Sequence, residues 1–117
     1  MFATAPLLLA IGQTFVIISG GIDLSVGFTM GLAAVVASQV MNLTAGTLGD
    51  VGSLMAGVAA AGLVAVVPGV VNGLLIARLR VPPFIGTLGM YGVARGVAYL
   101  VAGGTTVPVD NPLLSFL

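Results

Sequence analysis

The sequence predicts an all-α protein, a polytopic transmembrane helix bundle with about four membrane helices. Hydrophobic residues make up 59% of the 117 residues and charged residues only 5%. Soluble domains carry about a quarter charged residues, so these few charges could not cover the surface of a water-soluble globule. The apolar runs are rich in Ala, Leu and Gly and lack the period-two alternation of barrel strands. We therefore expect a single transmembrane domain over residues 1–117.

The first part of the chain holds two apolar stretches, residues 6–19 and 24–41, separated by the sequence Gly20-Gly21-Ile22-Asp23. Together they are too long for one helix, because about 20 helical residues cross a bilayer. We expect two short helices joined by a tight turn at this Gly-Gly-x-Asp break; the alternative is one long, kinked or re-entrant element. Irregular backbone at membrane depth is tolerated only where protein or a cavity surrounds it, so Gly20 and Gly21 should face the protein interior.

Two further membrane helices are expected over residues 51–77, which carry no charge, and residues 84–102, which carry only Arg95. Residues 42–50 are polar and turn-rich, and we expect them to form a loop. Pro82 and Pro83 should end any helix that precedes them.

The arginines predict the topology. Arg78 and Arg80 share the short loop 78–83, and the positive-inside rule places that loop in the cytoplasm. The loop at 42–50 and the tail after residue 103 are then outside, and the break at 20–23 lies on the cytoplasmic side.

The helix expected over 51–77 carries a row of small residues at strict four-residue spacing, which suits close helix packing in lipid. Its members are Ser53, Gly57, Ala61, Ala65, Gly69, Gly73 and Ala77. We expect this row to pack against another helix.

The composition excludes several functions. The chain has no Lys, His, Cys or Trp. A Walker-type phosphate loop needs a Lys and a Ser-His-Asp triad needs a His, so neither can be assembled. A Cys/His metal site and a basic nucleic-acid surface are excluded as well. We expect no enzyme activity, no cofactor and no nucleic-acid partner.

Three polar residues in apolar surroundings are the candidate structural or pathway residues, together with Gly20 and Gly21. Asp23 precedes a helix expected from Leu24, so it can cap the first turn; the alternative is a polar point beside a transport path. Arg95 lies ~16 Å along its helix, near the membrane centre, and is either functional or a structural lock to carbonyl groups or Asp23. Asn72 is interpreted as a link between helices rather than a ligand contact.

Two stretches resemble the membrane permeases of bacterial sugar ATP-binding-cassette importers, of the ribose, xylose and galactose type. The first is residues 12–27, GQTFVIISGGIDLSVG, and the second is residues 72–90, NGLLIARLRVPPFIGTLGM. Ala94-Arg95-Gly96 and the pair Gly103-Gly104 extend the second. The similarity covers nearly the whole chain.

The resemblance implies a multi-pass protein of the bacterial inner membrane, surrounded by lipid. It implies three partners: cytoplasmic ATPase subunits, a periplasmic sugar-binding protein, and a second permease subunit in a dimer. It also implies that the chain is an N-terminal fragment of a longer permease. A different class stays open beside it, namely a small structural or self-assembling membrane protein, or an inactive truncated fragment.

Overall fold

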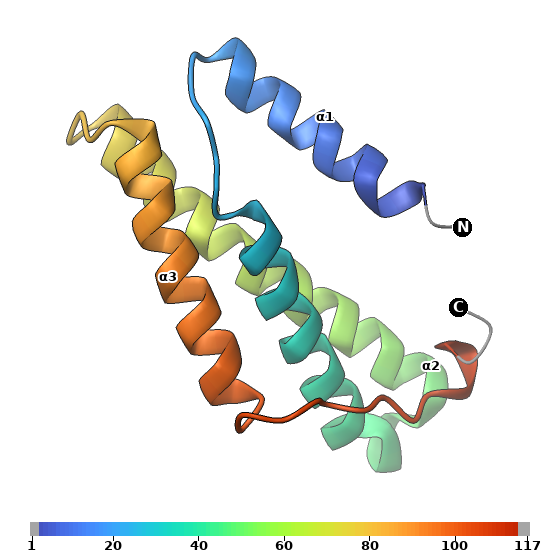
Figure 1. Ribbon diagram of the computed structural model, residues 1–117. Coiled ribbons are helices and arrows are strands. Elements are labelled where there is room, and N and C mark those ends of the chain that lie inside the picture. The colour runs from blue at the N-terminus through green and yellow to red at the C-terminus, as the bar shows by residue number, and fades with distance from the viewer. Residues whose placement is uncertain (1–2, 115–117) are drawn as a thin grey trace.

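The computed structural model describes residues 3–114, which form three α-helices and a short 3-10 helix, with no strand in this part of the chain (Figure 1). The elements are α1 (Thr4–Ile18), α2 (Val26–Ala77), α3 (Pro83–Val101) and η1 (Pro112–Leu114). The all-α prediction is therefore confirmed.

The helices expose apolar surface on most sides. α2 and α3 are long and apolar enough to cross a membrane, and α1 is a shorter apolar helix. The buried hydrophobic residues of the described chain are few: Leu32, Met41 and Ala94. A soluble protein would bury such helices in a core, whereas lipid solvates their side chains directly. The structure thus supports a membrane helix bundle.

Helix α2 folds back on itself at Gly49. A straight helix of its 52 residues would be about 78 Å long, yet the longest extent of the molecule is 46 Å. Gly49 supplies the bend with φ 67° and ψ −177°, a backbone conformation that is essentially restricted to glycine. We call residues 26–48 the first arm of α2 and residues 50–77 the second arm.

The expected loop at 42–50 is wrong, because the first arm stays helical up to the Gly49 bend. Its polar side chains find acceptors without leaving the helix. The Thr44 hydroxyl donates to the Val40 carbonyl at 2.7 Å, one turn earlier. The Asn42 amide donates to the Pro108 carbonyl at 2.8 Å. Pro108 belongs to the C-terminal tail, which crosses the molecule at the end where α2 bends (Figure 1).

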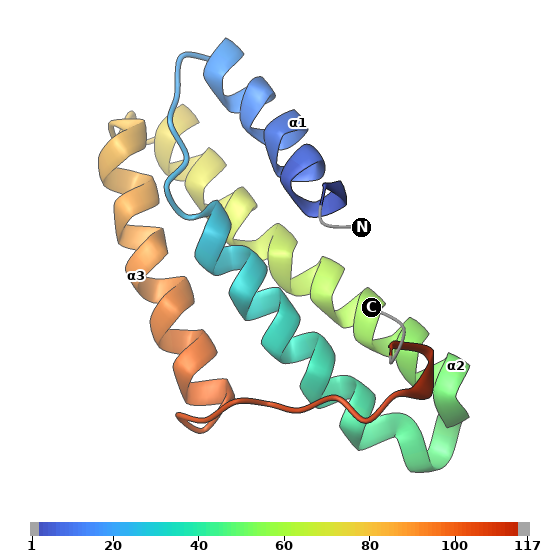
Figure 2. The same cartoon turned by 45° about the vertical axis from the view of Figure 1, so that its right-hand side comes forward.

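The bundle consists of α3 and the two arms of α2, which lie side by side in both views (Figures 1 and 2). The turn after α1 and the loop before α3 lie at one end. The Gly49 bend and the C-terminal tail lie at the other, where the Asn111 amide donates to the Asp50 carbonyl at 3.0 Å.

Helix α1 stands beside this bundle and has no buried residue. Its end is a Schellman motif, in which the Gly20 and Gly21 amides donate to the carbonyls of Ile17 and Val16. Gly20 has φ +78°, which favours glycine at this position.

The chain does not enter α2 by a tight turn, nor does α2 begin at Leu24. Residues 19–25 form a non-helical connector that runs from the end of α1 back toward the middle of the molecule, where α2 begins at Val26 (Figures 1 and 2).

The small-residue row packs only in its first part. Ser53 and Gly57 are buried, and a Cβ on Gly57 would lie 3.0 Å from the Ala37 carbonyl of the first arm. A Cβ on Gly69 or Gly73 would meet nothing within 4 Å. The reason is geometric: four residues turn an α-helix by roughly 40° more than one full turn, so a strict four-residue row winds away from its neighbour.

Candidate functional site

Three polar side chains meet where the connector enters α2. The Asp23 carboxylate oxygen Oδ1 accepts hydrogen bonds from the Ser25 amide at 2.8 Å and from the Ser25 hydroxyl at 2.6 Å. The Ser25 hydroxyl in turn accepts a hydrogen bond from Asn72 Nδ2 of the second arm at 3.1 Å. Ser25 and Asn72 are buried, with 2% and 5% of their surface exposed. This chain of hydrogen bonds fastens the start of the first arm to the second arm.

Side chains from the neighbouring helices satisfy two carbonyls of the connector. Gln13 of α1 donates from Nε2 to the Asp23 carbonyl at 2.7 Å. The Thr87 hydroxyl of α3 lies 3.1 Å from the Ile22 carbonyl and 2.8 Å from the Pro83 carbonyl of its own helix. Non-helical backbone would otherwise leave these two carbonyls unpaired, which is costly in apolar surroundings.

A cavity of about 420 Å³ lies beside the connector. Asp23 and Asn72 line it together with the end of α1, the second arm and the start of α3. A neighbouring cavity of about 490 Å³ is lined mainly by the two arms of α2, with Leu9 contributed by α1. Asp23 and Gly69 line both cavities.

Two polar atoms near these cavities are buried without a hydrogen-bond partner: Asn72 Oδ1 and Thr29 Oγ1. Asn72 lines the first cavity and Thr29 lines the second. Buried polar atoms are normally paired, so an unpaired one calls for a specific explanation.

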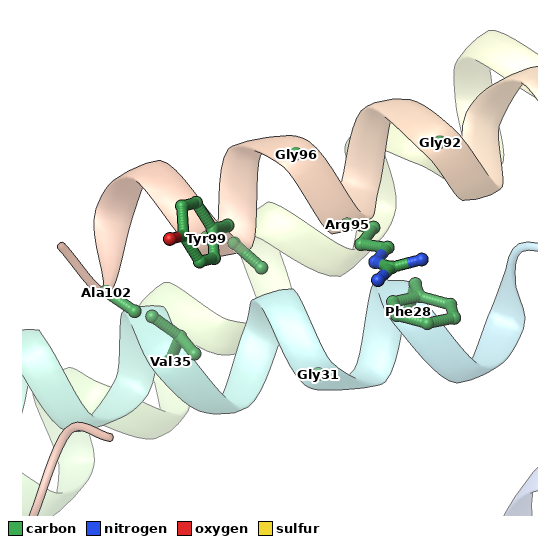
Figure 3. A pocket seen from close by; sticks show the side chains of 9 residues that line it. Phe28, Gly31, Val35, Gly92, Arg95, Gly96, Tyr99 and Ala102 are labelled. Atoms are coloured by element: carbon green, nitrogen blue, oxygen red, sulfur yellow. The ribbon is translucent and has the colours of Figure 1, made fainter. Parts of the chain in front are cut away.

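Arg95 occupies a separate groove between the first arm and α3, shown in Figure 3. Its guanidinium carbon lies 5.7 Å from the centroid of the Phe28 ring, a cation–π arrangement. The Phe28 ring also packs edge-on against Tyr91, with 4.4 Å between the centroids. Glycines of both helices line the groove, which leaves the exposed Arg95 side chain room beside the ring.

The structure brings Gly21, Asp23 and Asn72 to one cavity, with Gly20 at the adjoining turn, and places Arg95 elsewhere. Within the described residues, no hydrogen bond or ion pair joins Arg95 to Asp23. Instead, each has its own neighbour, Phe28 for Arg95 and Ser25 for Asp23.

Sequence reasoning missed Gln13, Ser25 and Thr87. Each is a polar residue in an otherwise apolar segment, which is the signal that could have identified them. Ser and Thr are less conspicuous than charged residues, because a helix can satisfy their hydroxyls locally.

Comparison with known proteins gives a consistent result. A family model described as "Branched-chain amino acid transport system / permease component" matches residues 1–114. The chain is 39% identical over 120 residues to the autoinducer 2 import system permease protein LsrC of Yersinia pseudotuberculosis serotype O:3 (strain YPIII). It has the same identity to the protein of that name from Yersinia pestis (strain Pestoides F).

Each of these alignments covers 98% of the chain and 32% of the relative, so the chain spans about a third of the length of the curated relatives it matches. No solved structure was found to match the chain.

Proposed function

The chain belongs to the branched-chain amino acid transport system / permease component family, and from this membership we propose that it forms part of the translocation pathway of an ATP-binding-cassette importer. One observation carries the proposal, the match of the family model to nearly the whole chain. We propose a sugar as the solute, because residues 12–27 and 72–90 resemble the corresponding stretches of sugar importer permeases.

The architecture supports a role in a pathway. Apolar surface faces outward on the helices, while hydrogen-bonding groups gather around cavities beside the connector. We propose four membrane crossings, formed by α1, the two arms of α2, and α3. The Gly-Gly-x-Asp break then lies in the connector between the first two crossings. The end that carries Arg78 and Arg80 would face the cytoplasm.

We assign the candidate residues to the support of this pathway. Asp23 holds Ser25 at the entry to α2, and Asn72 links the two arms through the same hydroxyl. Gly20 permits the turn that ends α1, and Gly21 continues the chain beside Pro83. Arg95 lies over Phe28, between the first arm and α3. None of these arrangements assembles a catalytic group, and the proposed role is transport without a cofactor.

The proposed setting is the bacterial inner membrane, with the chain as one transmembrane domain of a longer permease. The proposed partners are a second permease subunit, cytoplasmic ATPase subunits and a periplasmic sugar-binding protein. The chain has no lysine for a Walker-type nucleotide site, so the energy for transport would come from the ATPase subunits.

Reconstitution tests this proposal. Liposomes that contain the permease with these residues, its ATPase subunits and its binding protein should take up labelled sugar when ATP is supplied. Liposomes with the 117-residue chain alone should take up none under the same conditions. Absence of ATP-dependent uptake by the complete set, for pentoses and hexoses alike, would refute the sugar importer. Uptake by the chain alone would refute the proposal that transport depends on the ATPase subunits.

A further inference from the structure

We propose that the groove between the first arm and α3 receives a membrane helix from the part of the permease outside these 117 residues, and that an aspartate or glutamate on that helix pairs with Arg95. This inference rests on the proposal that the chain is part of a longer permease. It goes beyond transport, because it names an interaction surface and the chemistry of the segment that covers it.

Arg95 carries a charge that nothing in residues 3–114 neutralises. Its guanidinium offers only N–H donors, and none of them finds an acceptor within this part of the chain. The Phe28 ring lies 5.7 Å from the guanidinium carbon and stabilises the cation through its π face, but it supplies no acceptor oxygen. No carboxylate of the described residues lines the groove. The side chain therefore lacks an anionic partner.

The position of Arg95 makes this charge costly in lipid. α3 has 19 residues, so it is ~28 Å long and about as long as the hydrocarbon core is thick. Arg95 lies ~18 Å from its start at Pro83 and ~9 Å from its end. Figure 3 shows the guanidinium beside Phe28, whereas Tyr99 and Ala102 lie farther along towards the end of α3. The side chain thus points away from the nearer end of the helix, as helical side chains generally do.

The groove has room for a helix at this level. Its volume is about 600 Å³, and its lining includes Gly31 of the first arm and both Gly92 and Gly96 of α3. A Cβ added at any of these glycines would meet nothing within 4 Å. Small residues allow helix backbones to approach closely in lipid. A helix seated on these glycines would bring its own side chains within reach of Arg95.

The charge of Arg95 selects the occupant. Acyl chains can fill an apolar groove but supply no acceptor. A second copy that used the same groove would place its own Arg95 against this one, and like charges repel. The alignments cover only 32% of the curated relatives, so a permease of that length has most of its chain available to cover the groove. A carboxylate is the acceptor of matching charge, and arginine binds it in a bidentate geometry.

A charge swap in the complete permease tests the pairing. Arg95→Asp should place two acids together and lower the yield of monodisperse protein in detergent about fivefold, as expected for coupled residues. Each aspartate or glutamate in the remaining membrane helices is then changed to arginine in this background, and one of these changes should restore the yield. Val93→Asp is the matched control, because Val93 is exposed on α3 outside the groove, and no swap should rescue it.

Cross-linking then identifies the chain that supplies the carboxylate, with Arg95 unchanged. Tyr99 lines the groove one turn beyond Arg95 and is 67% exposed. In a permease without other cysteines, Tyr99→Cys and a cysteine one turn from the identified carboxylate should be joined by a bifunctional thiol reagent within one chain. Leu100→Cys is the control, because Leu100 is 77% exposed but does not line the groove, and it should give no product.

A normal yield of Arg95→Asp, or the failure of every swap to restore the yield, would overturn the proposal. A cross-linked product with the mass of a dimer would make a second copy the occupant and overturn it as well. Neither measurement involves uptake. A negative result alongside ATP-dependent sugar transport would leave the proposed function intact, whereas a paired Arg95 in an importer that transports no sugar would reject the proposed function alone.

Discussion

Asp23 of the connector and Asn72 of the second arm both form a hydrogen bond with the hydroxyl of Ser25. Asp23 Oδ1 accepts its proton at 2.6 Å, and Asn72 Nδ2 donates to its oxygen at 3.1 Å. A residue of the connector and a residue of the second arm are thereby joined through the residue that precedes α2. The point where the helical backbone resumes is thus fixed by side chains rather than by apolar packing.

The Ser25 hydroxyl should therefore matter for stability. Ser25→Ala removes both side-chain hydrogen bonds and leaves the buried Asn72 amide unpaired, which should lower the free energy of unfolding by about 1–3 kcal/mol. Unfolding in detergent micelles, followed by circular dichroism, measures this change. Ser38→Ala is the matched control, because Ser38 donates only to the Ala34 carbonyl within its own helix. Equal stability of the two variants would contradict the prediction.

Thr87 provides a second test of how the connector is held. Thr87→Val keeps the shape of the side chain but removes the hydroxyl near the Ile22 carbonyl, so it should destabilise the fold by about 1 kcal/mol or more. Thr14→Val is the control, since Thr14 is exposed and donates to the Ala10 carbonyl one turn back in α1. If Thr14→Val proves as harmful as Thr87→Val, the connector does not depend on the Thr87 hydroxyl.

Close packing of the two arms depends on Gly57. A Cβ there would lie 2.6 Å from the Met41 side chain and 3.0 Å from the Ala37 carbonyl, and the backbone oxygen cannot move aside cheaply. Gly57→Leu should cost about 1–3 kcal/mol through overpacking. Gly62→Leu on the same arm should be tolerated, because nothing lies within 4 Å of its Cβ position. The same unfolding measurement compares the two variants, and similar losses would show that the arms do not meet at Gly57.

The sequence was sufficient to predict the all-α class and the ends of two of the helices, because apolar runs and proline breaks are local properties. Pro82-Pro83 marks the start of α3, and α1 ends within one residue of the apolar stretch. The sequence predicted a loop over residues 42–50, and the bend of α2 at Gly49 falls within that range. Polar residues there indicated a loop, whereas Thr44 and Asn42 find their acceptors while remaining helical.

The site could be predicted only in part. Asp23 and Asn72 stand out as polar residues in apolar stretches, but their meeting at Ser25 depends on how the connector folds back along the second arm. The predicted packing of the small-residue row extended too far along the helix for a related reason. Sequence spacing shows which residues share a helix face, but it does not show where the neighbouring helix diverges.

The orientation in the membrane can be tested with single cysteines, because the natural chain has none. Leu79 is 69% exposed at one end of the molecule, and Thr106 is exposed on the tail at the other. An impermeant thiol reagent should label Thr106→Cys in intact cells, and it should label Leu79→Cys only after the membrane is permeabilised. The reverse pattern would place Arg78 and Arg80 outside.

Asp23 and Arg95 should support the fold independently of each other. The sequence allowed a direct contact between them, but the structure gives each a separate neighbour. The Asp23 carboxylate accepts from Ser25, while the Arg95 guanidinium lies over Phe28. Groups without a shared partner normally have additive effects on stability, within about 0.5 kcal/mol.

A double-mutant cycle with Asp23→Asn and Arg95→Gln measures this in the permease that contains these residues. Each single change should reduce the amount of assembled protein recovered in detergent. The loss of free energy of unfolding in the double variant should equal the sum of the two single losses. The pair Asp23→Asn and Asn72→Leu serves as the positive control, because both side chains bond to the Ser25 hydroxyl and should be coupled.

A double variant of Asp23 and Arg95 that loses clearly less than the sum would show that the two charges interact. Normal assembly combined with a selective change in apparent affinity for sugar would instead make them solute ligands.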